Sequence, residues 1–281
     1  MRPPCAAVLK ESAAVAGTSG TLVAMATPLA PTATLERAGE VRCSTYAEHE
    51  APAWCADLVE CTWVGVAGWD RSLHVMPDGC VDLAWDGRAL TLSPATETAR
   101  RVDVRAGSPT VGVRLHPAAA AAVTGPVLQE LRTPVALRDL WPRREVDGLD
   151  DELHRVSNER ASAVLAAAVM AHGGWDGRGP DRRLRAAIEH LRRPATSVEQ
   201  AAAGVGWSVR QLRRRCVEDV GLTPKALQQV LRFHRALQAL GPGSLARVAV
   251  ANGYADQAHL TRSFRRHAGA APAALARRLR A

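Results

Sequence analysis

Two segments near the C-terminal end repeat one pattern of apolar and polar positions, and the rest of the chain is organised around them. The segments span residues 196–216 and 244–266. Each begins with a short Ala-rich stretch, turns at a glycine (Gly206 or Gly253), and continues into a second stretch with a polar outer face. Four apolar residues of the first copy have the i, i+3, i+4, i+7 spacing of one helical stripe: Val198, Ala201, Ala202 and Val205. The pattern predicts two short helices joined by a tight turn, twice.

Polar residues at the expected helix starts support these helices. Thr196 precedes Glu199 by three residues, and Ser208 precedes Gln211 by three, which is the spacing of a capping box. The small alanines allow the two helices of each copy to cross closely. Each copy is therefore a predicted helix-turn-helix, the unit that places its second helix in the major groove of DNA.

The second helix of the first copy separates into two faces. Its apolar residues are expected to face inward: Val209, Leu212 and Cys216. Arg210 and Arg213 fall on another face and are candidates for reading guanine through its O6 and N7 atoms, or for gripping phosphate instead. Arg214 is open to two interpretations, a phosphate contact or an internal ion pair.

The second copy offers a different set of polar side chains. Leu260 and Phe264 are the expected inward pair, and Asp256 is expected to cap the helix. Gln257 and His259 are candidate base readers. Arginines that follow them are expected to bind the DNA backbone: Arg262, Arg265 and Arg266. The full predicted DNA-binding set is Ser208, Val209, Arg210, Arg213, Arg214, Asp256, Gln257, His259, Thr261, Arg262 and Arg265.

The two copies and the segment between them resemble the DNA-binding domain of AraC/XylS-type transcriptional regulators. The matching pieces are Gly206-Trp-Ser208, Leu212-x-Arg214, Gly221-Leu-Thr-Pro224, Leu231-Arg-x-x-Arg-Ala236, Gly253-Tyr254, Arg262-Ser-Phe264 and Gly269-x-x-Pro272. Four residues depart from the family's usual choice: Cys216 and Leu260 replace Phe, Arg265 replaces Lys, and Ala271 replaces Ser. The resemblance covers residues 181–279. It implies promoter binding, transcription activation and RNA polymerase as a partner.

In the N-terminal part the apolar residues no longer follow the helical spacing. Short segments that alternate apolar and polar residues, separated by turn signals, predict six strands over residues 58–67, 72–76, 80–85, 88–92, 101–104 and 110–115. Pro77-Asp78-Gly79 and Asp86-Gly87 are the clearest turn signals. Short helices are expected over residues 117–123 and 127–131. The predicted fold class is α+β, with a small β-barrel or sandwich-like domain before an all-α domain with two helix-turn-helix motifs.

Residues 46–145 also resemble an uncharacterised, sensor-like domain that precedes the DNA-binding domain in one AraC-type subgroup. Three stretches carry this resemblance: Val75-Met-Pro-Asp-Gly-Cys-Val-Asp-Leu83, Val111-Gly-Val-Arg-Leu-His-Pro117 and Pro134-Val-Ala-Leu-Arg-Asp-Leu-Trp141. The resemblance implies no particular ligand.

The predicted organisation has four parts. They are a disordered tail over residues 1–40, a sensor or dimerisation domain over 41–172, a linker over 173–180 and the DNA-binding domain over 181–281. A helix over residues 151–171 suits either packing on the strands or a homodimer contact. Helices over 181–191 and 224–240 are expected to begin the DNA-binding domain and to join its two motifs, the second with Thr223 as its cap.

The charge distribution agrees with this division. The chain of 281 residues has a net charge of +8. Residues 181–281 hold 19 Lys or Arg and 6 Asp or Glu, a net +13, so the remainder is −5. An Arg-rich genome would also supply arginine to solvated faces, but here the arginines cluster on the predicted second helix. A basic third joined to an acidic remainder fits a module that binds a polyanion.

An effector site needs apolar walls and a few polar groups. The candidates in the N-terminal domain are Trp63, His74, Asp82, Trp85, Arg114 and His116, although the tryptophans suit a core equally well and Asp82 suits a satisfied backbone contact.

Other functions are predicted to be absent or secondary. The sequence has no Gly-x-Ser-x-Gly, P-loop or His-Glu-x-x-His motif, and we expect no catalysis, cofactor or metal site. No apolar run approaches the ~20 residues that span a bilayer, and a cytoplasmic location is expected. Two alternatives stay open. One is a thiol or metal sensor, or a repair-type regulator, that uses Cys43, Cys55, Cys61 and Cys80; the other is an architectural DNA binder without an effector.

Overall fold

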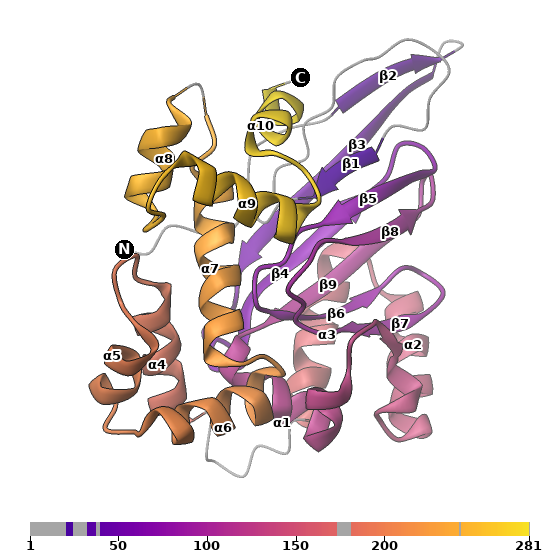
Figure 1. Ribbon diagram of the computed structural model, residues 1–281. Helices are drawn as coiled ribbons and strands as arrows, with labels where there is room; N and C mark the ends of the chain where they lie inside the picture. Colours follow the sequence, from indigo (N-terminus) through magenta and orange to yellow (C-terminus); the bar gives the residue numbers. More distant parts are fainter. Residues whose placement is uncertain (1–20, 25–32, 38–39, 173–180, 242, 281) are drawn as a thin grey trace.

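The computed structural model describes residues 21–24, 33–37, 40–172, 181–241 and 243–280. In Figure 1 the strands gather on one side of the molecule and the C-terminal helices on the other, with the long helix α7 (Pro224–Gln238) between them. The predicted linker over residues 173–180 lies outside the described residues. The structure is mixed α+β, as predicted, and the strands of the described residues form open sheets without a closed barrel.

The larger sheet of the described residues has seven strands in the order β10-β7-β6-β9-β4-β3-β2, and neighbouring strands are antiparallel. The strands are β2 (Ala33–Arg37), β3 (Glu40–Glu50), β4 (Val59–Val66), β6 (Val81–Trp85), β7 (Leu90–Ser93), β9 (Pro109–Leu115) and β10 (Val135–Ala136). Its central strands are the most buried, and apolar side chains lie at alternate positions along them. Val81 of β6 pairs with Leu115 of β9, and Leu83 pairs with Val113.

A smaller sheet of three strands lies beside it, in the order β1-β5-β8. It consists of β1 (Thr21–Ala24), β5 (Arg71–Val75) and β8 (Arg100–Val104); β1 is parallel to β5, and β8 is antiparallel to it. All six predicted strands are present within two residues of their predicted bounds.

The prediction of a disordered tail over residues 1–40 is wrong for two segments. β1 and β2 both fall inside that range, while residues 1–20, 25–32 and 38–39 lie outside the described structure. The reason is pairing at sheet edges: β5 and β3 each offer unpaired backbone N–H and C=O groups, and an additional strand satisfies these whatever its composition.

Helices cover the larger sheet on the side away from the smaller one. They are η1 (Pro117–Ala119), α1 (Ala120–Thr124), η2 (Gly125–Glu130), η3 (Leu137–Asp139), α2 (Arg143–Arg155) and α3 (Asn158–His172), with α3 against β4 and β9. The single helix predicted over residues 151–171 is wrong. The chain breaks at Val156, whose backbone is extended (φ −108°, ψ 160°) and whose side chain packs against the core.

The C-terminal part consists of helices. They are α4 (Arg182–Arg192), α5 (Val198–Gly204), α6 (Val209–Val220), α7, α8 (Leu245–Ala251), α9 (Gln257–Ala268) and α10 (Pro272–Arg280). Thr223 caps α7, as predicted, by accepting a hydrogen bond from the Ala226 N–H at 3.2 Å. No helix among the described residues is both long and apolar enough to cross a membrane.

The apolar cores of the two parts are continuous across their boundary. Ala118, in η1, belongs to the cluster formed by α4, α5 and α6. Met76 and Ala99 pack into the cluster formed by α7, α8 and α9. Leu222, in the turn before α7, contacts both the N-terminal core and the first of these clusters. The C-terminal helices are therefore docked on the N-terminal part through buried apolar contacts.

Candidate nucleic-acid interface and cavity

The first helix-turn-helix consists of α5 and α6. The turn at Gly206 has φ +69°, and the Trp207 N–H donates to the Ala202 carbonyl at 2.9 Å. Ser208 and Gln211 form the predicted capping box: each backbone N–H bonds to the other residue's side-chain oxygen, at 2.8 and 3.2 Å. The other predicted capping box is displaced by one residue, because Ser197 with Gln200, rather than Thr196 with Glu199, caps α5.

The outer face of α6 is basic and exposed. Arg210, Arg213 and Arg214 are all exposed, while Leu212 and Cys216 are fully buried on the opposite face. The prediction that Val209 faces inward is wrong, because its side chain is 42% exposed at the first position of the helix. That exposure leaves it on the same side as the predicted DNA-binding residues.

The internal ion-pair role considered for Arg214 belongs to its neighbour. Arg215 pairs with Asp181 at 3.0 Å and with Asp219 at 3.2 Å, which ties α6 to the start of α4. Within the described residues Arg214 makes no ion pair, and its side chain extends into solvent. The phosphate contact is therefore the interpretation that the geometry favours for Arg214.

The second helix-turn-helix consists of α8 and α9. Its turn approaches the segment between α4 and α5 closely, since a Cβ added at Gly253 would lie 2.4 Å from the Pro194 carbonyl oxygen. Leu260 and Phe264 are fully buried, as predicted. Asp256 caps α9, also as predicted, by accepting a hydrogen bond from the His259 N–H at 2.6 Å.

The polar side chains of α9 differ in how far they are available. Gln257, Arg262 and Arg265 are exposed. The Thr261 hydroxyl donates to the Gln257 carbonyl at 2.8 Å, and the half-buried His259 ring meets the Tyr254 ring edge to face, with 5.1 Å between centroids. Gln257 is thus the freer of the two candidate base readers.

Helix α7 holds the two units together. Its Phe233 ring packs edge to face on Phe264 of α9, with 4.9 Å between ring centroids. Its Arg235 donates to the Asn252 side-chain oxygen at 3.1 Å, to the Asn252 carbonyl at 3.2 Å and to the Arg192 carbonyl. One guanidinium therefore links the ends of α4 and α8.

A cavity of about 390 Å³ lies between the two sheets. Three of the predicted effector residues line it: Trp63, Asp82 and Arg114. Apolar side chains from β5 and β8, including Leu73, Val75 and Val102, complete its wall. The volume falls within the range of about 300–1,000 Å³ that is usual for small-molecule sites.

The other three predicted effector residues do not line the cavity. Trp85 is buried on the helix-covered side, where its indole N–H donates to Asp150 at 2.8 Å. His116 is buried and caps η1 by accepting the Ala118 N–H at 3.1 Å. His74 lies on β5 between two residues that line the cavity but does not itself line it.

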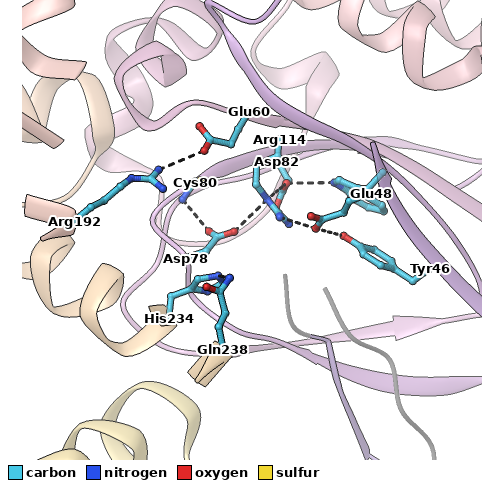
Figure 2. Close-up of polar contacts among 11 residues, drawn as sticks. Tyr46, Glu48, Glu60, Asp78, Cys80, Asp82, Arg114, Arg192, His234 and Gln238 are labelled. Carbon is cyan, nitrogen blue, oxygen red and sulfur yellow. Dashed lines mark hydrogen bonds and ion pairs between the residues drawn. The ribbon is translucent and has the colours of Figure 1, made fainter. Parts of the chain in front are cut away.

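Arg114 is the centre of a buried polar cluster at one end of the cavity (Figure 2). Its guanidinium pairs with Asp78 at 3.1 Å, Asp82 at 3.1 Å and Glu48 at 2.9 Å. The Tyr46 hydroxyl donates to Glu48 at 2.8 Å. One cation thus holds three carboxylates, one from β3 and two from the neighbouring positions 78 and 82.

The pKa values of the carboxyl groups in the cluster are shifted in different directions. Burial raises the pKa of Asp82 and of Glu48. Burial also acts to raise the pKa of Asp78, but the Arg114 charge, the His234 ring and the hydrogen bond from the Cys80 N–H together outweigh it and hold that pKa below its usual value. Asp78 is therefore the carboxylate whose negative charge the cluster favours most.

The loop that carries Asp78 also touches the C-terminal helices. Figure 2 shows Asp78 between Arg114 and His234 of α7. A Cβ added at the next residue, Gly79, would lie 2.7 Å from the Leu227 side chain of α7. Close by, Arg192 of α4 pairs with Glu60 at 3.7 Å. One end of the cavity is thus built from the loop on which α7 is docked.

Sequence reasoning missed several of these residues. Tyr46, Glu48, Asp78 and Arg100 all belong to the cluster or the cavity wall but were not among the candidates. The available signal was the polar side chains at alternate positions of β3, Tyr46 and Glu48, which is unusual for a strand inside a sheet.

The cysteines with described side chains are all buried: Cys55, Cys61, Cys80 and Cys216. Burial raises the pKa of Cys80 well above its usual value, and raises that of Cys216 to about 12. Among the described residues, no group of three or more His, Cys, Asp or Glu side chains is placed to hold a metal ion. Cys5 lies outside the described residues, and the side chain of Cys43 is not described.

Comparisons with known proteins match both parts of the chain. A family described as a helix-turn-helix domain matches residues 202–278, and a domain of unknown function (DUF6597) matches residues 48–135. No curated protein matches the chain.

Several solved structures are also similar to parts of this chain. A transcriptional regulator with an AraC-type DNA-binding domain from Chromobacterium violaceum is 25% identical over 35% of this chain and 92% of that chain, with a TM-score of 0.33. The C-terminal domain of AraT, a response regulator from Geobacillus stearothermophilus, is 20% identical over 34% of this chain and 81% of that chain, with a TM-score of 0.32. ToxT from Vibrio cholerae is 10% identical over 75% of this chain and 94% of that chain, with a TM-score of 0.41.

Proposed function

We propose that the chain is an AraC-type DNA-binding transcription regulator and that it binds promoter DNA through α6 and α9 in adjacent major grooves. A matched helix-turn-helix domain that follows a matched domain of unknown function supports this proposal. In this proposal α6 reads bases through Arg210 and Arg213, and α9 through Gln257. Arg214, Arg262 and Arg265 neutralise phosphates beside the two grooves.

The observation that carries this proposal is the exposed basic face of α6 on a unit that is locked to a second, similar unit. At 1.5 Å per residue, the 15 residues of α7 span roughly 22 Å. With the width of the helices added, this length suits two recognition helices that enter grooves roughly 34 Å apart on one side of a duplex. The net charge of +13 on residues 181–281 supplies the general attraction to DNA.

Genome-wide mapping of the DNA bound by the full chain tests the proposal. We expect a common sequence with two half-sites spaced by about one helical turn. A fragment that carries this sequence should bind more tightly than a shuffled fragment of equal length at moderate ionic strength. A purified protein that does not distinguish bound fragments from shuffled ones would contradict sequence-specific regulation.

We further propose that the cavity between the sheets binds a small-molecule effector. Its apolar walls and its polar end at Arg114 suit a molecule with an apolar body and one polar group. A ligand shifts an equilibrium only through different affinities for two conformations. Asp78 and Gly79 supply a route for such a difference, because the same loop borders the cavity and contacts α7.

A thermal-shift screen against a metabolite panel tests the effector. We expect a compound that raises the melting temperature of the wild type and changes its affinity for the mapped DNA. The Ala84→Leu variant, which places a larger side chain at the cavity wall, should lose both responses. A broad panel without any response would instead favour an effector-free architectural DNA binder.

A further inference from the structure

A second hollow, of about 180 Å³, lies between α7 and α9 beside the second helix-turn-helix. Three arginines line it: Arg232 from α7, and Arg262 and Arg266 from α9. His259 also lines it, and none of the described residues that line it carries a carboxylate. A hollow with three guanidinium groups and no negative charge in its wall is suited to a small, doubly hydrogen-bonded anion such as a phosphate.

The wall of the hollow holds its central arginine in place. The Arg232 guanidinium lies over the Tyr254 ring, 5.6 Å from the centroid, and the Tyr254 hydroxyl is 3.0 Å from the Ser263 hydroxyl. Tyr254 is buried and Arg232 is half-buried. A guanidinium stacked on a fixed ring loses less conformational freedom on binding than a free surface arginine does.

An anion from the N-terminal part already reaches one of these arginines. Arg266 donates to the Glu97 carboxylate at 2.6 Å. The loop that carries Glu97 is fixed there, because the Ala99 N–H donates to the His267 carbonyl at 2.6 Å and the His267 ring donates to the Glu97 carbonyl at 2.5 Å. The Glu97 carboxylate does not itself line the hollow, but it already pairs with one of the three guanidinium groups that a phosphate there would meet.

We propose that this hollow binds a backbone phosphate of the DNA that α9 reads, and that Arg232 is a DNA-binding residue together with Arg262 and Arg266. In the DNA-free protein, Glu97 takes the place of that phosphate at Arg266, so the N-terminal part competes with DNA for the second recognition helix. This inference rests on the proposed function, since the phosphate belongs to the duplex that the protein binds.

The salt dependence of DNA binding tests the role of Arg232. With a labelled duplex of random sequence, Arg232→Ala should weaken binding roughly threefold to tenfold and reduce the slope of log K against log[salt] by about one. Arg232→Lys should retain the slope, because it keeps the positive charge. Arg160→Ala removes an exposed arginine from α3 and is the matched control, for which the slope should stay unchanged.

The competition by the Glu97 carboxylate is tested by a substitution that should raise the affinity for DNA rather than lower it. Glu97→Gln should raise the affinity for the same duplex about twofold to fivefold, as expected for the loss of one exposed ion pair. Glu159→Gln, which removes an exposed carboxylate from α3, is its charge-matched control and should have a smaller effect. In an Arg266→Ala background, Glu97→Gln should give no gain beyond that control, since the arginine for which the two anions compete is absent.

The results separate the inference from the function on which it rests. A wild-type protein that does not bind duplex DNA would contradict both. A wild type that binds DNA, with Arg232→Ala folded and unchanged in affinity and salt slope, would overturn the phosphate site alone. A gain from Glu97→Gln that persists undiminished without Arg266 would overturn the competition. Circular dichroism and the melting temperature of each variant establish that it is folded.

Discussion

Arg210 occupies the second position of α6, where its exposed side chain follows the capping box at Ser208. Residues near the start of a recognition helix are the ones that meet base edges in helix-turn-helix complexes. We predict that Arg210→Ala weakens specific binding by roughly 1–3 kcal/mol and relaxes discrimination at one base position. Titrations of the mapped fragment and of single-base variants measure both effects.

The comparison that decides this prediction is with random DNA. A base contact contributes little to non-specific binding, so the affinity of Arg210→Ala for a shuffled duplex should fall by less than its affinity for the mapped fragment. Arg160→Ala, which lies on α3 away from α6, should change neither affinity appreciably. Equal losses on both duplexes would assign Arg210 to the phosphate backbone.

Gly112 is required by the side chain across from it. It pairs with Trp63 between β9 and β4, and an added Cβ would lie 2.2 Å from the indole ring. Gly112→Ala therefore forces the cavity wall apart, and we predict a loss of about 1–3 kcal/mol in the free energy of unfolding. Gly148 offers a matched substitution in α2, since nothing lies within 4 Å of its added Cβ.

Gly148→Ala should stabilise the protein by up to about 1 kcal/mol, because alanine has the higher helix propensity. Urea denaturation of the two variants beside the wild type measures the difference. Two variants of equal stability would show that the contact between Gly112 and Trp63 does not constrain the sheet.

At the scale of single elements, α7 carries a buried histidine that faces the cluster at the end of the cavity. Burial lowers the pKa of His234 to about 4, with Asp78 opposing that effect and Arg114 and Arg192 adding to it. The Gln238 side-chain nitrogen lies 2.9 Å from the ring. In the folded protein the ring is therefore neutral over most of the range in which a free histidine binds a proton.

The direction of the pH dependence follows from linkage. Between pH 6.5 and pH 4 the unfolded chain binds a proton at His234 that the folded chain does not, so stability falls as the pH falls through this window. We predict that His234→Gln removes a loss on the order of 1–3 kcal/mol between these limits. Urea denaturation at several pH values checks the difference between wild type and variant.

The prediction concerns the difference between wild type and His234→Gln in how stability depends on pH, rather than the pH dependence of either protein alone. The raised pKa values of Glu48 and Asp82 act in the opposite direction, because the folded protein then binds protons more readily than the unfolded chain. Asp78, whose pKa is lowered, loses its stabilising charge only at lower pH. These carboxyls are present in both proteins. Parallel curves for wild type and His234→Gln would mean that His234 titrates alike in the folded and unfolded chain.

Sequence patterns predict those elements whose apolar residues recur at a regular spacing. Residues 80–85 alternate, and the structure has β6 at Val81–Trp85. One of the strands that were missed, β3, carries Tyr46 and Glu48 on the face that would otherwise be apolar, because these side chains face Arg114. A polar cluster thus removes the signal by which its own strand would be recognised.

The candidate sites likewise differ in how far a local sequence pattern predicts their residues. Arg210 and Arg213 were predictable because a helix repeats its faces at a fixed spacing within one segment of sequence. Glu48 and Arg114 meet only because β3 and β9 both pair with β4, across 66 positions of the chain. No local pattern determines such a register, so Glu48 and Asp78 were not predicted. Trp85 and His116 suited an effector site by residue type, yet backbone and side-chain partners elsewhere hold them.

At the scale of the whole molecule, the decisive feature is that the loop with Asp78 and Gly79 both borders the cavity and contacts α7. Asp78 is part of the cavity end, and Gly79 lies against Leu227 and Leu231 of α7. The second recognition helix is joined to the N-terminal part separately, through Glu97 and Arg266. These are two of several contacts that hold the DNA-binding helices to the N-terminal part, so that release at one of them would leave the others as tethers.

Gly79 and Gly87 allow the first of these contacts to be tested with matched backbone strain. Both have positive φ, +85° and +83°, so alanine costs a similar strain energy at each position, on the order of 1 kcal/mol. Only at Gly79 does the added Cβ collide with α7, 2.7 Å from Leu227, whereas nothing lies within 4 Å at Gly87. We predict that Gly79→Ala loosens the docking of α7 and that Gly87→Ala does not.

Hydrogen exchange measured by mass spectrometry checks this prediction. Backbone amides of α7 and of the loop around Asp78 should exchange faster in Gly79→Ala than in Gly87→Ala, while those of β6 should be similar in the two variants. If Glu97 competes with DNA as proposed, the looser protein should also bind the random duplex more tightly, because the Glu97–Arg266 pair then has less support from α7 and opens more often. Equal exchange in the two variants would show that α7 tolerates the extra methyl group and that the Gly79 contact does not hold the two parts together.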